Sequence, residues 1–110
     1  MKQNETKKNV KNVSQHYDTL RKLIVTLESA KDALVAHKNF GLAEAILSEY
    51  YEELPQDLED DSTTKPLYHA LRDRNRELLF SSIEAELERL SILKINLLRD
   101  KIVQRKLKNY

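Results

Sequence analysis

The 110-residue sequence predicts an all-α protein, an antiparallel bundle of three or four helices with a long C-terminal helix. Three observations lead to this prediction. The chain has one Gly and two Pro, whereas a β-sandwich or barrel uses such residues in a turn roughly every 8–12 residues. Apolar residues recur at spacings of three and four, the period of a helix that faces a core. No stretch shows the alternation typical of a half-buried strand.

Composition also limits the classes of function. A chain without Cys forms no disulfide framework, zinc–thiolate site or thiol nucleophile. Charged residues make up 34% of the chain, yet the net charge is only +1, which weakens a case for nucleic-acid binding because such domains are usually strongly basic. No apolar run reaches the roughly 18–20 residues of a membrane span, and the first residues lack the apolar core that a secretory signal needs. We therefore expect a cytoplasmic or nuclear protein with no membrane partner.

The first segment, residues 1–13, is polar and rich in Lys, and we expect a flexible basic N-terminal tail. A single helical domain is expected over residues 14–110. Ser14 belongs to the residue types that cap helix N-termini, so the first helix is expected to begin there.

An apolar stripe runs from Val13 to Leu34 and is interrupted at Asn39-Phe40-Gly41. Two interpretations compete: a helix–turn–helix in which Gly41 supplies the left-handed C-cap, and one long helix kinked at Gly41. We favour the break, because Asn and Gly are the residues that adopt the left-handed conformation most readily.

Pro55 is expected to end the second helix, since Pro lacks an amide hydrogen and restricts the residue before it. An acidic loop follows at about 55–65, and six acids without a base lie within residues 52–61. We interpret it mainly as a solvated connection, with docking onto a basic partner or binding of a divalent cation as alternatives. Thr64 is a candidate cap for the next helix, with Pro66 in its first turn.

The C-terminal segment, from Leu67 to about Leu107, contains neither Gly nor Pro. One helix of about 40 residues would extend roughly 60 Å, which is long for a domain whose radius of gyration is expected near 13 Å. Either this helix projects and pairs with something, or it breaks. The candidate break is the capping-box pattern Ser81-Ser82-Ile83-Glu84.

Nothing in the sequence points to catalysis. The three His residues are not spaced as a pair of ligands on one helix face, and neither Glu-x-x-His nor His-Glu-x-x-His occurs. No Ser has the glycines of a nucleophile elbow. We expect no enzyme, no catalytic or metal-binding residues and no cofactor.

The C-terminal segment carries more apolar surface than one core contact needs. Leu90, Leu93 and Leu97 form one stripe, and a neighbouring stripe forms a candidate partner-binding face. A helix that is apolar over two stripes is either central in a bundle or shared with a partner, as in a coiled coil. The candidate face comprises Ile92, Ile95, Leu98 and Ile102.

Charge is segregated along the same segment. Glu84, Glu86 and Glu88 come early, and basic residues come late. This polarity complements the helix macrodipole. The alternative interpretation is a basic end that contacts phosphate or an acidic partner. The basic residues are Arg99, Lys101, Arg105, Lys106 and Lys108.

Two families share patterns with these residues. Glu86-Leu87-Glu88-Arg89-Leu90 followed by Leu97-Leu98-Arg99-Asp100-Lys101-Ile102-Val103 resembles the end of the helical domain of GINS replication-complex subunits, and Leu54-Pro55-Gln56-Asp57 is similar to a segment of their archaeal members. That resemblance implies a scaffold in a replicative helicase assembly with no activity of its own.

The chain is also similar to the flagellar export chaperones that include FliT. The shared features are its length, a first long helix that ends near Asn39-Phe40, and a late helix that ends in Arg105-Lys106-Leu107-Lys108-Asn109-Tyr110. This resemblance implies an export or assembly chaperone.

The sequence as a whole predicts a non-catalytic protein–protein interaction or assembly module that uses the apolar face of its C-terminal helix. The expected partner is a second copy, as in a dimer, or another protein in a hetero-complex. The alternatives are a scaffold subunit of a replication complex, an export chaperone, and a nucleic-acid-associated protein that acts through its basic termini.

Overall fold

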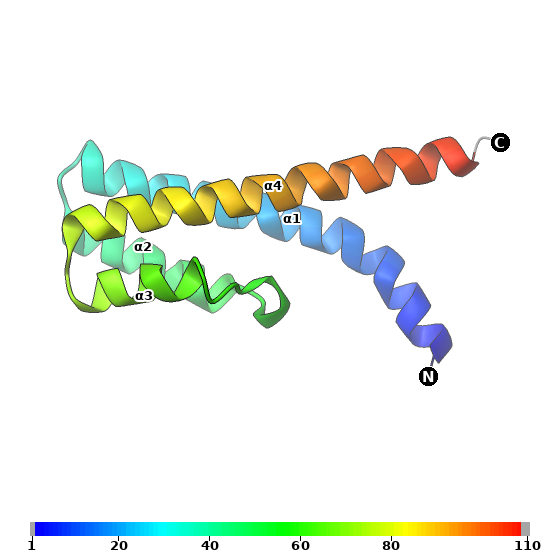
Figure 1. Ribbon diagram of the computed structural model, residues 1–110, viewed down its shortest axis with the longest axis horizontal. Helices are drawn as coiled ribbons and strands as arrows, with labels where there is room; N and C mark the ends of the chain where they lie inside the picture. Colours follow the sequence, from blue (N-terminus) through cyan, green and yellow to red (C-terminus); the bar gives the residue numbers. More distant parts are fainter. Residues whose placement is uncertain (1, 109–110) are drawn as a thin grey trace.

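The protein is an all-α bundle, with four helices and one 3₁₀ turn in the part of the chain that the structure describes (Figure 1), which confirms the predicted fold class. The computed structural model describes the backbone of residues 2–108 and the side chains of residues 16–100. Within that backbone there is no β-strand. The elements are α1 (Lys2–Val35), α2 (Phe40–Glu53), η1 (Gln56–Leu58), α3 (Thr64–Arg72) and α4 (Arg76–Lys108).

The two long helices form the spine of the molecule. α1 packs against both α2 and α4, and α3 packs against α4. Each of these pairs is antiparallel, and the short helices α2 and α3 cover only about half of the spine (Figure 1). Beyond them, the N-terminal part of α1 and the C-terminal part of α4 diverge (Figure 1). The shape is therefore elongated, with extents of 53 × 28 × 20 Å and a radius of gyration of 16.4 Å.

A single apolar cluster joins all four helices and the 3₁₀ turn. Its α1 members recur at spacings of three and four, as the sequence predicted. Leu20, Leu27, Leu47, Leu67 and Leu90 have no exposed surface. The other members are Leu23, Ile24, Ala30, Ala33, Leu34, Ala43, Tyr50, Leu54, Leu58, Ala70, Leu79 and Ile83.

The break between α1 and α2 is where the sequence placed it, but its residues have different roles. Lys38 adopts the left-handed conformation, with φ of 51°. Asn39 is the N-cap of α2, and its side-chain oxygen accepts a hydrogen bond from the Leu42 amide at 3.0 Å. Gly41 lies in the first turn of α2 and has no positive φ. The assignment of the left-handed cap to Gly41 was wrong, because the Asn39 side chain fixes the start of α2 before that residue.

A second break, at Asp73-Arg74-Asn75, separates α3 from α4. It repeats the chemistry of the first: Arg74 is left-handed with φ of 53°, and the Asn75 side chain accepts from the Leu78 amide at 3.1 Å. α4 then continues through Ser81 without interruption. The long C-terminal segment therefore does break, but at an Asn cap and not at the capping-box pattern of residues 81–84.

Both breaks lie at the same end of the bundle (Figure 1), where Arg74 and Arg76 link them. The Arg74 guanidinium lies over the Phe40 ring, 4.6 Å from its centroid, and contacts the Glu44 carboxylate at 3.2 Å. The Arg76 side chain donates to the Leu34 carbonyl at 2.8 Å. That carbonyl is among the last of α1, which have no partner within the helix. These contacts connect the two helical hairpins.

The start of α1 differs from the prediction. The helix begins at Lys2, so Ser14 lies within it and the helix extends over residues 2–13 of the predicted tail. Lys, Gln and Glu favour helix, and this stretch has no Gly or Pro. Val10 also continues the three-and-four spacing ahead of Val13 and Tyr17.

The connection between α2 and α3 is folded against the core. α2 ends at Glu53 before Pro55, as predicted, and the 3₁₀ turn buries Leu58. Thr63 occupies the N-cap position of α3. The prediction that Thr64 caps this helix was wrong: Thr64 is its first residue, and its side chain is buried. In the described residues, no helix has the length and apolar character needed to cross a membrane.

Candidate interaction surface

The C-terminal half of α4 extends past the short helices that cover its N-terminal half (Figure 1). Among the described side chains of α4, Leu90 is the last that is fully buried. From residue 91 to residue 100 no side chain is buried. Leu93 and Leu97 still pack partly against the core cluster. This stretch therefore has one face on the bundle and the remaining faces in solvent.

Three of the four predicted partner-binding residues lie on that solvent side. Ile92, Ile95 and Leu98 are 51%, 54% and 43% exposed. Ile95 is two residues from both Leu93 and Leu97, a rotation of roughly 200° at 3.6 residues per turn, so it faces away from the core. The fourth, Ile102, lies on α4, but its side chain is outside the described residues.

Charged side chains flank the exposed apolar residues. Glu84 and Glu88 are exposed on the N-terminal side, and Arg99 is exposed on the C-terminal side. Glu84 contacts the Lys31 ammonium at 3.5 Å at the protein surface. The remaining basic residues of the predicted contact, Lys101, Arg105, Lys106 and Lys108, lie on the α4 backbone and their side chains are not described.

Glu86 has a different role from the one that its position in the charge pattern suggested. Its carboxylate is fully buried and accepts hydrogen bonds from four side chains. Tyr50 Oη donates to Oε2 at 2.6 Å and Thr64 Oγ1 donates to the same oxygen at 3.0 Å. Thr63 Oγ1 and Arg89 Nε each donate to Oε1 at 2.8 Å. The cluster joins α2, α3, α4 and the connection between α2 and α3.

The buried network extends from Glu86 to the acidic connection. Thr64 Oγ1 accepts from the Asp60 amide at 3.1 Å, and the Tyr51 hydroxyl donates to the Thr64 carbonyl at 3.1 Å. Asp60 in turn accepts from the Ser62 hydroxyl and amide. Among the described side chains, every buried nitrogen or oxygen atom has a hydrogen-bond partner. The predicted solvated loop is therefore partly fixed to the core by polar contacts.

The ionisation of this cluster follows from its contacts. Burial by itself raises the pKa of Glu86, but hydrogen bonds from Arg89, Tyr50 and Thr63 outweigh burial and lower it. Burial and the bond to Glu86 raise the pKa of Tyr50 well above its usual value. Glu86 is thus a carboxylate at neutral pH and Tyr50 a neutral phenol. All four partners of Glu86 donate hydrogen bonds, so the cluster stabilises a charge and offers no free base.

Sequence reasoning missed this cluster, although one signal was present. Glu86 falls on the stripe formed by Leu79, Ile83 and Leu90, with spacings of four, three and four. A charged residue on an apolar stripe indicates a buried and paired group. Its partners come from elsewhere in the chain, and no local pattern connects them.

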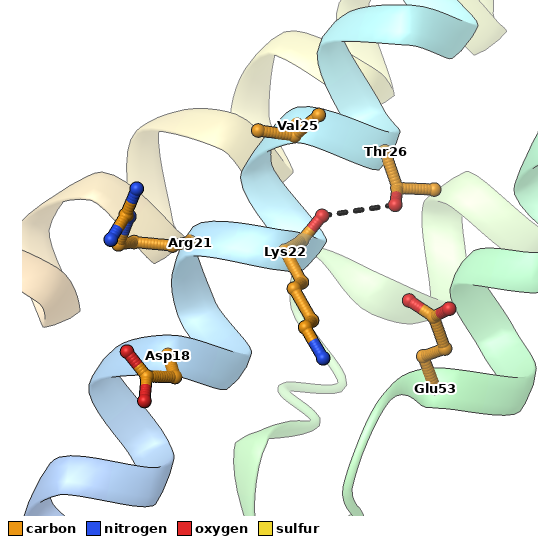
Figure 2. Close-up of a pocket in the computed structure, with 6 residues that line it drawn as sticks. All are labelled: Asp18, Arg21, Lys22, Val25, Thr26 and Glu53. Atoms are coloured by element: carbon orange, nitrogen blue, oxygen red, sulfur yellow. Dashed lines mark hydrogen bonds between the residues drawn. The ribbon is translucent and has the colours of Figure 1, made fainter.

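A surface hollow of about 530 Å³ lies between α1 and α2 (Figure 2). Asp18, Arg21, Lys22 and Glu53 contribute both signs of charge to its lining. The Thr26 hydroxyl donates back to the Lys22 carbonyl at 2.9 Å and so is used within its own helix (Figure 2). The lining therefore offers no single sign of charge that selects a ligand.

The histidines lie apart in the structure. His16 Nε2 contacts Asp57 at 3.1 Å, His37 Nε2 contacts Asp32 at 3.4 Å, and the His69 ring packs against Tyr68. Among the described residues, no cluster of three His, Asp or Glu side chains is arranged to hold a metal ion.

Comparison with known proteins returns no match: no family model, no curated protein and no solved structure matches the chain. These comparisons therefore leave the two family resemblances of the sequence as expectations. The Glu86 cluster is satisfied within the bundle, whereas the outer face of α4 exposes apolar side chains to solvent.

Proposed function

We propose that the protein is a non-catalytic interaction or assembly module that binds a protein through the exposed face of α4. The observation that carries this proposal is the exposure of Ile92, Ile95 and Leu98 on one side of a helix that runs beyond its own bundle. An exposed apolar face on a projecting helix is typical of a binding site for another helix.

The three apolar side chains alone contribute too little free energy to hold a partner. About half of each of these three side chains is already covered, so their full burial contributes roughly 2–4 kcal/mol. Association itself costs an estimated 4–15 kcal/mol or more. A stable complex therefore also needs contacts along the rest of the helix, including its charged residues.

The test is the double substitution Ile95→Asp with Leu98→Asp. We expect it to abolish association and leave helicity intact, because both side chains face solvent. Sedimentation mass across a concentration series, capture of partners from the native extract and circular dichroism provide the three measurements.

The matched control is Val25→Asp with Leu42→Asp, which places the same charges on exposed apolar positions of α1 and α2. We expect this control to associate like the wild type. The proposal is wrong if Ile95→Asp with Leu98→Asp retains every association of the wild type, or if it unfolds while the control remains folded.

A further inference from the structure

Four exposed side chains on α4 form what we call the outer stripe: Glu88, Ile92, Ile95 and Arg99. Their spacings are four, three and four, so they lie in a row along one face of the helix. Leu90, on the opposite side, is fully buried in the bundle. A helix laid along the outer stripe would therefore displace none of the core contacts.

The side chains of the outer stripe are arranged so that the stripe is complementary in charge to a second copy of itself that runs in the opposite direction. From the N-terminal end it places an acid, two isoleucines and a base. Read from the other end, the base comes first and the acid last. Two antiparallel copies therefore bring Glu88 opposite Arg99 at both ends and Ile92 opposite Ile95 in the middle.

From this pattern we infer that the occupant of the α4 face is a second copy of the same chain. The two α4 helices would pack antiparallel about a twofold axis that passes between Ile92 and Ile95. This inference rests on the proposed function, since it names the partner of the same face. It supplies the contacts that the apolar residues alone lack, because each dimer gains two Glu88–Arg99 pairs.

A parallel arrangement of the same helices is disfavoured by charge. It would place Glu88 against Glu88 and Arg99 against Arg99, and like charges across an interface weaken it. An antiparallel pair instead sets Glu88 of each helix against Arg99 of the other.

The experiment measures the dimer dissociation constant by sedimentation equilibrium at low salt, with circular dichroism to check folding. The variants are Glu88→Lys, Arg99→Glu and the double variant that carries both. Each single reversal creates two like-charged contacts per dimer and should raise the dissociation constant roughly tenfold. The double variant should return to the wild-type constant, because it exchanges the two charges of each pair.

A mixture of the two single variants provides a second, independent readout. In a mixed antiparallel dimer Lys at position 88 faces Glu at position 99, and Arg99 faces Glu88. The mixture should therefore associate more strongly than either variant alone. The controls are Asp100→Lys on the same helix and Arg21→Glu on α1, both exposed and off the outer stripe. We expect each of them to change the constant by less than either charge reversal on the outer stripe, since neither side chain lies opposite a charge of the partner helix.

Three results would overturn the inference. A wild-type chain that stays monomeric at every concentration excludes the second copy. A dimer that Ile95→Asp with Leu98→Asp abolishes, but that neither charge reversal weakens, excludes the antiparallel pairing. A dimer that neither kind of substitution affects uses another surface.

These results also separate this inference from the proposed function. If the wild type is monomeric and yet captures another protein in a manner that depends on Ile95 and Leu98, the α4 face binds a different partner. In that case the self-association is wrong and the proposed function stands. If neither association nor capture depends on those residues, both fail.

Discussion

The hydroxyl of Tyr50 on α2 donates a 2.6 Å hydrogen bond to the buried carboxylate of Glu86 on α4. α2 and α4 are separated by 36 positions at this contact, and neither is the other's main packing neighbour. The bond therefore crosses the bundle and links two helices that otherwise make few contacts with each other. Since Thr63, Thr64 and Arg89 donate to the same carboxylate, Glu86 organises the polar centre of the fold.

Replacement of this carboxylate should be costly. Glu86→Gln keeps the size of the side chain, but its amide places a donor among groups that already donate, and Arg89 loses its ion-pair partner. We expect a loss of about 2–4 kcal/mol in the free energy of unfolding, measured by urea denaturation. Glu49→Gln, at an exposed position of α2, is the control and should change stability by less than about 0.5 kcal/mol. Equal losses of unfolding free energy in both variants would show that the contacts of the Glu86 carboxylate do not stabilise the fold.

The Tyr50 hydroxyl should contribute less than the carboxylate that it binds. Tyr50→Phe keeps the buried ring and removes one of the four donors to Glu86. We expect a loss of about 1–2 kcal/mol, because Glu86 Oε2 keeps its bond from Thr64. Tyr68→Phe removes a hydroxyl from an exposed ring and should be close to neutral. Urea unfolding of the two variants side by side measures the difference, and a neutral Tyr50→Phe would contradict this account.

Acid should destabilise the protein through Glu86. Its pKa is lower in the folded chain than the ordinary value of 4.5. The stabilisation is therefore complete above that ordinary value and is lost as the pH falls through the folded pKa, where the carboxylate must take up a proton. Urea midpoints measured between pH 7 and pH 3 should fall more steeply for the wild type than for Glu86→Gln. Parallel pH profiles would assign the acid sensitivity to other carboxylates.

The two Asn caps should each contribute to stability. Asn39→Ala and Asn75→Ala remove the side-chain oxygens that bind the amides of Leu42 and Leu78. Each change should cost about 1 kcal/mol in thermal or urea unfolding. Asn96→Ala, at an exposed position within α4, is the control and should be neutral or slightly stabilising, since Ala favours helix interiors. A loss at Asn96 as large as at the caps would refute the capping roles.

The position of the helices was largely predictable because it depends on neighbours within a few residues. Apolar spacing identified α1, the scarcity of Gly excluded a sheet, and Pro55 marked the end of α2. The break before α4 was missed at its true position, because Arg74 adopts the left-handed conformation expected of Gly and the Asn75 side chain caps the helix that follows. An Asn followed three residues later by Leu is a weak signal of a helix start, because the same spacing also occurs by chance. The hydrogen bond from the Leu78 amide to Asn75 is what identifies the cap.

The sequence by itself determined that the chain is helical and which residues of α4 form a second apolar stripe. It also determined where α1 ends and where α2 begins and ends. These properties follow from period and turn chemistry, which act over one or two turns. Tertiary structure decided that Glu86 is buried while Glu84 and Glu88 are exposed. It also decided that, among the described side chains of α4, none after Leu90 is fully buried and that Ile92, Ile95 and Leu98 are half-exposed. Both outcomes depend on the packing of distant segments, because the lengths of α2 and α3 set how much of α4 is covered.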